Sequence, residues 1–356
     1  MAAHPPPGVY VPVPTFFASK KAADYDPVAA PVDIATQVAH SLYGKHRAPS
    51  THYPPSHIQE APSELTPQSP QDLAKAGIKG LVLLGSTGEA IHLTSAERTT
   101  ILSGVRQAYD REGFPDYPIV AGTATQNVAE TVEQLRGARD AGAQWGLCLV
   151  PGYFAGASTQ EGIVRWFTAV ADQSPIPIMI YHYPGVSNNV KVTVSTIVTL
   201  SAHANIVGCK LSHGDVSYHA QVASNPSIDH AHFATFTGLG QQLLPVIAVG
   251  AAGAIDGCAG FFPKTVVKLY ELALKNRPSD DEVARRRALQ FKVSAMEELV
   301  VRFGTVGIKE AVSRLRGMGD CDGTRLPLFG GIPGGDDEWA KWKECVGMME
   351  EEENSL

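Results

Sequence analysis

One lysine of this chain stands where a charged side chain is costly. Lys210 closes the apolar run IVGCK (206–210), whose pattern is typical of the end of a buried strand. Burial disfavours the ammonium form and lowers the pKa of a lysine, so that its neutral amine can attack a carbonyl carbon. The iminium ion that forms is an electron sink for a carbanion on the neighbouring carbon. The structural alternative is a surface lysine whose aliphatic stem packs on apolar neighbours.

Hydroxyl groups accompany two other apolar runs. The run IPIMIYHY (176–183) contains Tyr181, and GLVLLG (80–85) leads into Ser86 and Thr87. A tyrosine within reach of an imine can carry protons to and from the substrate. The glycine-bracketed turn at Ser86 and Thr87 can present N–H groups and hydroxyls to a carboxylate. A core tyrosine with a satisfied hydroxyl, and hydroxyls that only form a turn, are the structural alternatives.

Three further polar side chains lie near the ends of apolar runs. Tyr153 follows the fourth run, His182 adjoins Tyr181, and Asp256 follows Ile255 in the eighth. A structural, hydrogen-bonded histidine is at least as good an interpretation of His182, and Tyr153 can simply pack in a loop. The candidate set has one lysine with tyrosines and hydroxyls, and it has neither clustered carboxylates nor metal-ligand spacing. It therefore favours imine chemistry with neither a metal nor an organic cofactor.

Eight apolar runs alternate with amphipathic stretches. The runs cover residues 8–17, 80–85, 118–123, 145–150, 176–183, 205–210, 232–238 and 253–260. Most are continuously hydrophobic, as strands buried on both faces must be. Strands that alternate with helices predict a parallel sheet, and eight βα units predict an α/β fold, the (β/α)8 or TIM barrel, whose active site lies at the carboxyl ends of the strands. An open dinucleotide-binding sheet is disfavoured because no Gly-x-Gly-x-x-Gly follows the first run.

Helices are predicted between the strands and beyond the last one. Residues 94–113 begin with a capping-box signature, in which Thr94 is followed by Glu97. After the eighth strand come three amphipathic stretches, residues 264–277, 281–304 and 305–319. These patterns predict a catalytic barrel domain over residues 1–265 and a C-terminal helical domain over residues 266–350.

One segment, residues 43–71, interrupts the predicted first helix. It is rich in Pro, Ser and His, has no apolar period, and separates VDIATQVAHSLY (32–43) from DLAKAGIKG (72–80). A disordered surface insertion over residues 44–71 is one interpretation. A retained intron is the other, because its opening Gly-Lys, its Leu-Thr and its closing Gln can be encoded by splice-site sequences. Sequencing of the mature transcript distinguishes the two.

The composition disfavours several classes of partner. The net charge is −7, and Lys and Arg form no basic stripe that would favour nucleic acid. No apolar run approaches the roughly 20 residues of a membrane span. The five cysteines include no CxxC pair, and no secretory or transit peptide is evident, so we expect reduced thiols and a cytoplasmic protein.

The motifs together resemble a known family. GSTGE (85–89), YHYPG (181–185) and VGCKLSHGD (207–215) are similar to the dihydrodipicolinate synthase / N-acetylneuraminate lyase family of pyruvate-dependent class I aldolases. The resemblance extends from GVYVPVPTFF (8–17) to FGTVGIKEAV (303–312), and so covers most of the chain outside 43–71. GSTGEAIHLTSAER is closest to the branch of 2-keto-3-deoxy acid and 4-hydroxy-2-oxoglutarate aldolases.

The resemblance implies a role for each motif residue. Lys210 would form the Schiff base with pyruvate or another 2-keto acid, and Tyr181 would relay protons. Ser86 and Thr87 would bind the carboxylate of the keto acid. Tyr153 would reach across a dimer interface into the neighbouring active site, since the family is usually a homotetramer built as a dimer of dimers.

One position departs from the dihydrodipicolinate synthases. They carry an arginine after the YxxPG motif that holds the carboxylate of the aldehyde substrate, whereas this chain has Val186. A valine cannot bind a carboxylate through two hydrogen bonds. The neutral side chains of Ser187, Asn188 and His182 would suit a polyhydroxy aldehyde, and Ile255 falls where a backbone group lines the family's pocket.

We therefore expect a lyase that cleaves a 4-hydroxy-2-keto acid to pyruvate and an aldehyde through an imine on Lys210. The substrate would be a 2-keto-3-deoxy sugar acid or 4-hydroxy-2-oxoglutarate. A 4-hydroxy-tetrahydrodipicolinate synthase or a keto-acid dehydratase is the alternative among enzymes. A keto-acid-binding protein without catalysis is the alternative from another class.

Overall fold

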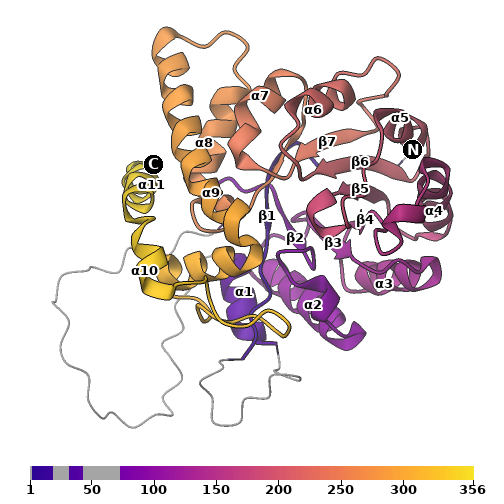
Figure 1. Ribbon diagram of the computed structural model, residues 1–356, viewed down its shortest axis with the longest axis horizontal. Helices are drawn as coiled ribbons and strands as arrows, with labels where there is room; N and C mark the ends of the chain where they lie inside the picture. Colours follow the sequence, from indigo (N-terminus) through magenta and orange to yellow (C-terminus); the bar gives the residue numbers. More distant parts are fainter. Residues whose placement is uncertain (1, 19–31, 43–72) are drawn as a thin grey trace.

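The structure is a computed structural model that describes residues 2–18, 32–42 and 73–356. Eight parallel strands, each paired with its neighbours in sequence order, close into a barrel, as the sequence predicts (Figure 1). The strands are β1 Gly8–Pro12, β2 Gly80–Leu83, β3 Ile119–Thr123, β4 Trp145–Leu149, β5 Ile178–His182, β6 Ile206–Leu211, β7 Ala234–Thr237 and β8 Gly253–Ile255. The (β/α)8 fold is therefore confirmed.

Side-chain alternation divides the strand residues between two cores. Inward side chains form what we call the interior cluster: Tyr10, Val82, Val120, Leu147, Met179, Tyr181, Val207, Ala234, Phe236 and Ile255. Outward side chains pack beneath the helices in a larger core. Neighbouring residues of a strand face opposite sides. A shift of one residue in the register of a strand would therefore turn its inward side chains outward.

The observed strands are shorter than the apolar runs that predicted them. The first run, residues 8–17, is a strand only to Pro12, and the eighth, residues 253–260, is a strand only to Ile255. The remainder of the eighth run forms the short helix η5, Cys258–Gly260. The carboxyl ends of the runs thus supply the loops of the barrel mouth. Side chains there remain buried although their backbone no longer forms the hydrogen bonds of the sheet.

Helices surround the barrel, as Figure 1 shows. They are α1 Ile34–Leu42, α2 Ser95–Arg111, α3 Val128–Asp140, α4 Gln160–Gln173, α5 Val194–Ser201, α6 Val216–Ala223, α7 Leu243–Ala248 and α8 Pro263–Ala273. The predicted capping box is present at α2, where the Thr94 side chain accepts from the N–H of Glu97 and Glu97 accepts from the N–H of Thr94. Each such reciprocal pair satisfies two backbone donors that a helix start leaves open.

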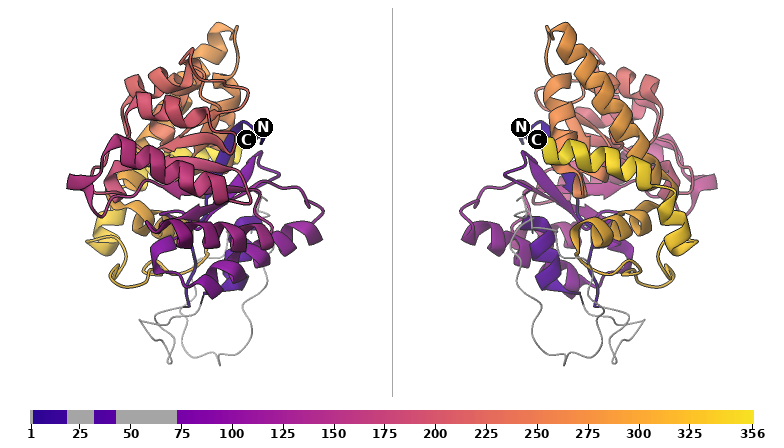
Figure 2. Two further views of the ribbon diagram at one scale, coloured as in Figure 1. Left: turned by 90° about the vertical axis from the view of Figure 1, so that its right-hand side faces the viewer. Right: turned by 90° about the vertical axis from the view of Figure 1, so that its left-hand side faces the viewer.

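The C-terminal helices pack against one side of the barrel (Figure 2). They are α9 Asp280–Arg316, α10 Gly335–Ala340 and α11 Lys343–Ser355. Helix α9 is interrupted at Gly304, whose φ of 56° and ψ of −137° are not helical, and the sequence predicts a boundary there. The predicted division between residues 265 and 266 falls inside α8, which contacts β1, α7, α9 and α11. The segment 44–71, with its two interpretations, lies outside the described residues.

Candidate active site

Lys210 lies on β6 with its side chain inside the barrel. Its two neighbours on the strand, Cys209 and Leu211, belong to the outer core, so alternation turns Lys210 inward. Its side chain is buried, and Nζ lies 4.6 Å from the centre of the Tyr181 ring. The lysine that the sequence singles out is therefore a barrel-interior residue and not a surface residue.

Burial changes the acidity of this amine. Desolvation lowers the pKa of Lys210 to about 7, although the carboxyl groups of Asp256 and Glu297 act in the opposite direction. An amine with this pKa is half deprotonated near neutral pH. Lys210 can therefore act as a nucleophile without a separate base to remove its proton.

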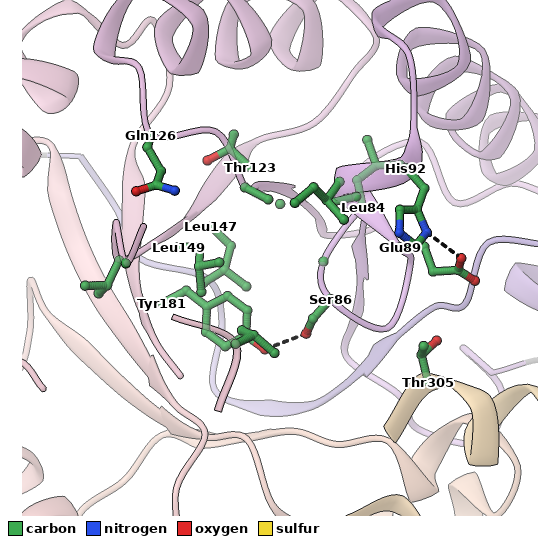
Figure 3. Close-up of a pocket in the computed structure, with 18 of the residues that line it drawn as sticks. Leu84, Ser86, Glu89, His92, Thr123, Gln126, Leu147, Leu149, Tyr181 and Thr305 are labelled. Atoms are coloured by element: carbon green, nitrogen blue, oxygen red, sulfur yellow. Dashed lines mark hydrogen bonds and ion pairs between the residues drawn. The ribbon is translucent and has the colours of Figure 1, made fainter. Parts of the chain in front are cut away.

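Tyr181 and Ser86 form the second part of the site. Tyr181 is paired with Lys210 in the β5–β6 register, and its hydroxyl makes a hydrogen bond of 2.8 Å with Ser86 Oγ (Figure 3). Burial raises the pKa of Tyr181 to about 12, against the effect of hydrogen bonds with Ser86 and Ser212. The tyrosine therefore stays protonated and can accept a proton only while it passes its own to a neighbour.

A pocket of about 470 Å³ opens beside these residues at the barrel mouth. Its polar lining comes from the following residues, most of which Figure 3 shows as sticks: Ser86, Glu89, His92, Thr123, Gln126, Tyr153, Tyr181, Asn188 and Thr305. Among the described residues, no lysine or arginine lines this pocket. Lys210 itself lies behind Tyr181 and is not part of the lining. The site thus combines a buried amine with a wall that offers hydroxyls, amides and the paired side chains of Glu89 and His92.

The loop with Ser86 and Thr87 is anchored by distant residues. Glu89, which is buried and has a left-handed φ of 50°, pairs with Lys309 of α9 and accepts from Arg325 N at 3.1 Å. Thr305 Oγ1 donates to the Thr87 carbonyl at 2.7 Å. Thr87 therefore lies next to the site, but its side chain is not among the pocket lining. The C-terminal helices fix the loop that is predicted to bind the carboxylate.

Tyr153 lies at the pocket mouth and is 73% exposed. Its ring contacts Phe154, which is 72% exposed, at an interplanar angle of 82°. The backbone N–H of Tyr153 donates to Gln126 Oε1 at 2.9 Å. Two adjacent exposed aromatic rings at the edge of a pocket are the kind of surface that a partner chain covers.

The turn after β5 forms another part of the pocket wall. The short helix η3, Pro184–Val186, places Val186 on the wall, where it is 45% exposed. Asn188 also lines the pocket, and its Nδ2 donates to the Gly152 carbonyl at 2.9 Å. Ser187 is instead buried, and its Oγ donates to the Tyr183 carbonyl at 2.9 Å. Of the predicted substrate contacts in this turn, Asn188 reaches the pocket and Ser187 supports the turn.

His182 faces away from the barrel interior. It follows Tyr181 on β5, so alternation places its ring in the outer layer, 4.9 Å from the His213 ring centre. Its Nε2 accepts from Val192 N at 3.2 Å. Burial, followed by the nearby His213 and His219, lowers its pKa to about 3. The structure does not bring His182 to the pocket, and a neutral, structural histidine explains its contacts.

The end of β8 contributes two different surfaces. Ile255 belongs to the interior cluster with Tyr181 but is not among the pocket lining. Asp256 points outward, where its carboxyl oxygens lie within 4.8 Å of Cys258 Sγ and a Glu297 oxygen. Those carboxylates already accept backbone hydrogen bonds, so they have fewer lone pairs to offer a metal ion.

Several pocket residues are absent from the sequence-based set. Thr123 is the last residue of β3, Gln126 follows that strand, and Thr305 comes from α9. The position of Thr123 at a strand end could have suggested it, because all strand ends meet at one rim. No local signal marks Thr305, which approaches the site only because α9 folds back over the barrel mouth.

Comparisons with known proteins agree with this geometry. The model of the "Dihydrodipicolinate synthetase family" matches residues 68–330. A protein of Emericella nidulans named "Probable 4-hydroxy-2-oxoglutarate aldolase, mitochondrial" is 32% identical over 88% of this chain and 86% of its own length. An "L-threo-3-deoxy-hexylosonate aldolase" of Hypocrea jecorina is 33% identical over 70% of this chain and 79% of its own. A crystal structure of a dihydrodipicolinate synthase family protein from Coccidioides immitis superposes with a TM-score of 0.75 at 27% identity, covering 99% of this chain and 98% of that one.

Proposed function

The chain belongs to the dihydrodipicolinate synthetase family, and we propose that it is a Schiff-base aldolase that cleaves a 4-hydroxy-2-keto acid to pyruvate and an aldehyde. The observation that carries the proposal is the buried amine of Lys210 against Tyr181, whose hydroxyl is hydrogen-bonded to Ser86. A buried lysine with a lowered pKa forms imines, and a tyrosine–serine pair can relay the proton that carbon–carbon cleavage releases.

The reaction uses these groups in order. The neutral amine of Lys210 attacks the C2 carbonyl, and uptake of one proton with loss of water leaves an iminium ion. Tyr181 accepts the proton of the C4 hydroxyl as it gives its own to Ser86, Ser86 gives its hydroxyl proton to solvent in the pocket, and the C3–C4 electron pair moves into the iminium. The products of this step are the aldehyde and an enamine. Protonation at C3 and hydrolysis then release pyruvate and restore the lysine.

The pocket wall supports a neutral aldehyde. Val186 stands where an arginine would hold a carboxylate. The lining of the described part of the chain offers hydroxyls and amides, and its His92 is already paired with Glu89, but it has no lysine or arginine. An aldehyde with hydroxyl groups can satisfy these polar groups, whereas a charged one would be desolvated without a counter-ion. We therefore favour a 2-keto-3-deoxy sugar acid over 4-hydroxy-2-oxoglutarate, although relatives bear both names.

Reductive trapping tests the proposed chemistry. Borohydride treatment in the presence of pyruvate should add a stable mass to the peptide that contains Lys210. Lys210→Ala should lose both this adduct and all cleavage activity, while Lys79→Ala, a change outside the barrel mouth, should keep both. An adduct that persists in Lys210→Ala would refute the proposal.

A substrate panel separates the remaining enzyme alternatives. Incubation with several 2-keto-3-deoxy acids and with 4-hydroxy-2-oxoglutarate should release pyruvate and an aldehyde. Loss of water without pyruvate would indicate a dehydratase, and consumption of pyruvate with aspartate semialdehyde would indicate the synthase. Trapping of pyruvate with no turnover of any substrate would indicate a binding protein.

The assembly and the location are also proposals. We propose a homotetramer in which Tyr153 completes the site of a partner subunit, because its exposed ring lies at the pocket mouth. No helix in the described residues is long and apolar enough to cross a membrane. We propose a cytoplasmic location, and microscopy of a C-terminal fluorescent fusion tests it against the mitochondrion named for one relative.

A further inference from the structure

Two carboxyl groups that the proposed reaction does not use are buried together beyond β8. Asp256 and Glu297, from α9, have no exposed surface. Asp256 Oδ1 accepts from Gly240 N at 2.8 Å, and Oδ2 accepts from Ala259 N at 3.0 Å. Glu297 Oε1 accepts from Cys258 N at 2.9 Å. Backbone donors therefore hold three of the four carboxyl oxygens in place.

The fourth oxygen, Glu297 Oε2, lacks such a donor. It is buried and has no hydrogen-bond partner among the described residues. An ionised carboxylate can only accept hydrogen bonds, and the carboxyl group beside it, that of Asp256, is also an acceptor. A proton on Glu297 resolves both problems, because Oε2 then becomes a donor to Asp256. Two carboxyl groups at one buried site share a proton in this way because the repulsion between two buried negative charges prevents both from being ionised together.

The electrostatic surroundings assign the proton to Glu297. Burial and the neighbouring Asp256 carboxylate raise the pKa of Glu297 well above its ordinary value. Burial also raises the pKa of Asp256, but there the hydrogen bond from Glu297, two backbone donors and the charge of Lys210 oppose the rise. Cys258 lies beside both carboxyls, and Glu353 and Cys345 of α11 act in turn on its thiol. Lys210 is the cation of the described residues that acts on both carboxyls.

We propose that Asp256 and Glu297 share one proton and present a single negative charge to Lys210, which supports the cationic states of that lysine. They are positioning residues, because they act through Lys210 and not on the substrate. Two charges would hold the amine as ammonium and prevent attack, and no charge would leave the iminium unsupported. The part that concerns the iminium rests on the proposed function; the shared proton does not.

Infrared difference spectroscopy tests the shared proton without any substrate. At about pH 8, where an ordinary glutamic acid is ionised, the wild-type chain should show the carbonyl stretch of a protonated carboxyl group. Glu297→Gln should lose this band, and Glu298→Gln, the same change at the adjacent exposed residue, should keep it. A wild-type spectrum without the band, or a band that survives Glu297→Gln, would overturn the proposal.

Two variants test whether the negative charge of the Asp256–Glu297 pair acts on the amine of Lys210. Asp256→Asn should lower the apparent pKa of imine formation with pyruvate by about one unit, and circular dichroism checks that it folds. Lys210→Met keeps the pair but removes the positive charge beside it. The carboxyl group of the pair that is still ionised should then become protonated at a higher pH than in the wild-type chain. An unchanged apparent pKa in folded Asp256→Asn, or an unchanged carboxyl titration in Lys210→Met, would disprove the coupling. A wild-type chain that forms no imine would instead contradict the proposed function, and the infrared result would still stand.

Discussion

At the scale of single residues, the reactivity of this protein depends on which charges are removed from water. Lys210 is buried against an aromatic ring, and the attraction of Asp256 and Glu297 opposes the effect of burial on its pKa. Desolvation therefore outweighs attraction, and the amine becomes neutral near physiological pH. The same burial has the opposite consequence for Tyr181, whose pKa rises to about 12, because its charged form is the deprotonated one.

The rate of imine formation should follow the protonation of Lys210. Below about pH 7 the amine is protonated and cannot attack, so the rate should rise as the pH approaches 7 from below and level off above it. Stopped-flow measurement of pyruvate imine formation between about pH 5 and 9 gives this profile. A rate that still rises tenfold between about pH 8 and 9, as for an amine with the ordinary lysine pKa of about 10.4, would contradict it.

At the scale of elements, α9 joins the two halves of the site. Its carboxyl-terminal part supplies Thr305 and Lys309 to the loop after β2, and its earlier part supplies Glu297 to the end of β8. Gly304 redirects the helix between these contacts. One kinked helix thus holds both the carboxylate-binding loop and the acidic pair, which explains why the barrel alone does not complete the site.

Removal of Lys309 should destabilise the chain. Among the described residues, Lys309→Met leaves the buried Glu89 with His92 and the backbone of Arg325 as partners. The free energy of unfolding should fall by about 3 kcal/mol. Urea denaturation measures the change. The double variant Lys309→Met with Glu89→Gln should recover most of the loss, because no buried charge remains. Equal losses in the single and double variants would show that packing, and not charge, dominates.

The outer face of β5 and β6 should make the fold sensitive to acid. Burial lowers the pKa of His182 to about 3 and also lowers that of His219. The folded state therefore binds fewer protons than the unfolded state, so stability is full above about pH 6.5 and is lost as the pH falls toward these lower values.

Urea denaturation at about pH 7.5 and 5.5 measures this loss. We expect about 1 kcal/mol from His182 at one pH unit below 6.5, because its pKa in the folded state is about 3. His182→Asn, whose amide oxygen can still accept from Val192 N, should reduce the difference. His230→Asn, a change at an exposed histidine, should leave it unaltered. The same pH dependence in both variants would exclude His182 as a source.

At the scale of the whole molecule, the exposed aromatic pair at the pocket mouth is the feature that a single chain leaves unexplained. Tyr153 and Phe154 adjoin a pocket whose inner polar residues, Glu89, Thr123 and Tyr181, are buried. A second subunit over this rim would bury them and narrow the entrance. Catalysis would then depend on assembly, since each site would draw a side chain from its partner.

Mixed oligomers test this dependence. Lys210→Ala and Tyr153→Phe should each be severely impaired alone, but their co-expression should restore on the order of a quarter of wild-type activity. Half of random pairs are mixed, and each mixed pair has one site with both residues intact. Activity assays of the tagged and purified mixture measure this. No recovery in a mixture that demonstrably contains both chains would show that Tyr153 serves its own subunit.

The sequence by itself determined the barrel and the type of chemistry, because both depend on local patterns. Apolar runs of strand length predict the strands, and strand ends predict the rim where Lys210, Tyr181 and Ser86 meet. Alternation could also have shown that His182 cannot share the face of Tyr181. The acidic pair of Asp256 and Glu297, by contrast, joins residues that are distant in sequence and carry no motif.

Only the tertiary structure decided which polar groups are paired, which lack a hydrogen-bond partner and which line the pocket. Glu89 meets Lys309, and Thr305 meets the Thr87 carbonyl, because α9 folds back across the barrel mouth. Hydrogen bonds and desolvation depend on distances of a few ångströms between segments far apart in the chain. A sequence states which groups are available, but burial and contact set their pKa values, and these follow from packing in three dimensions.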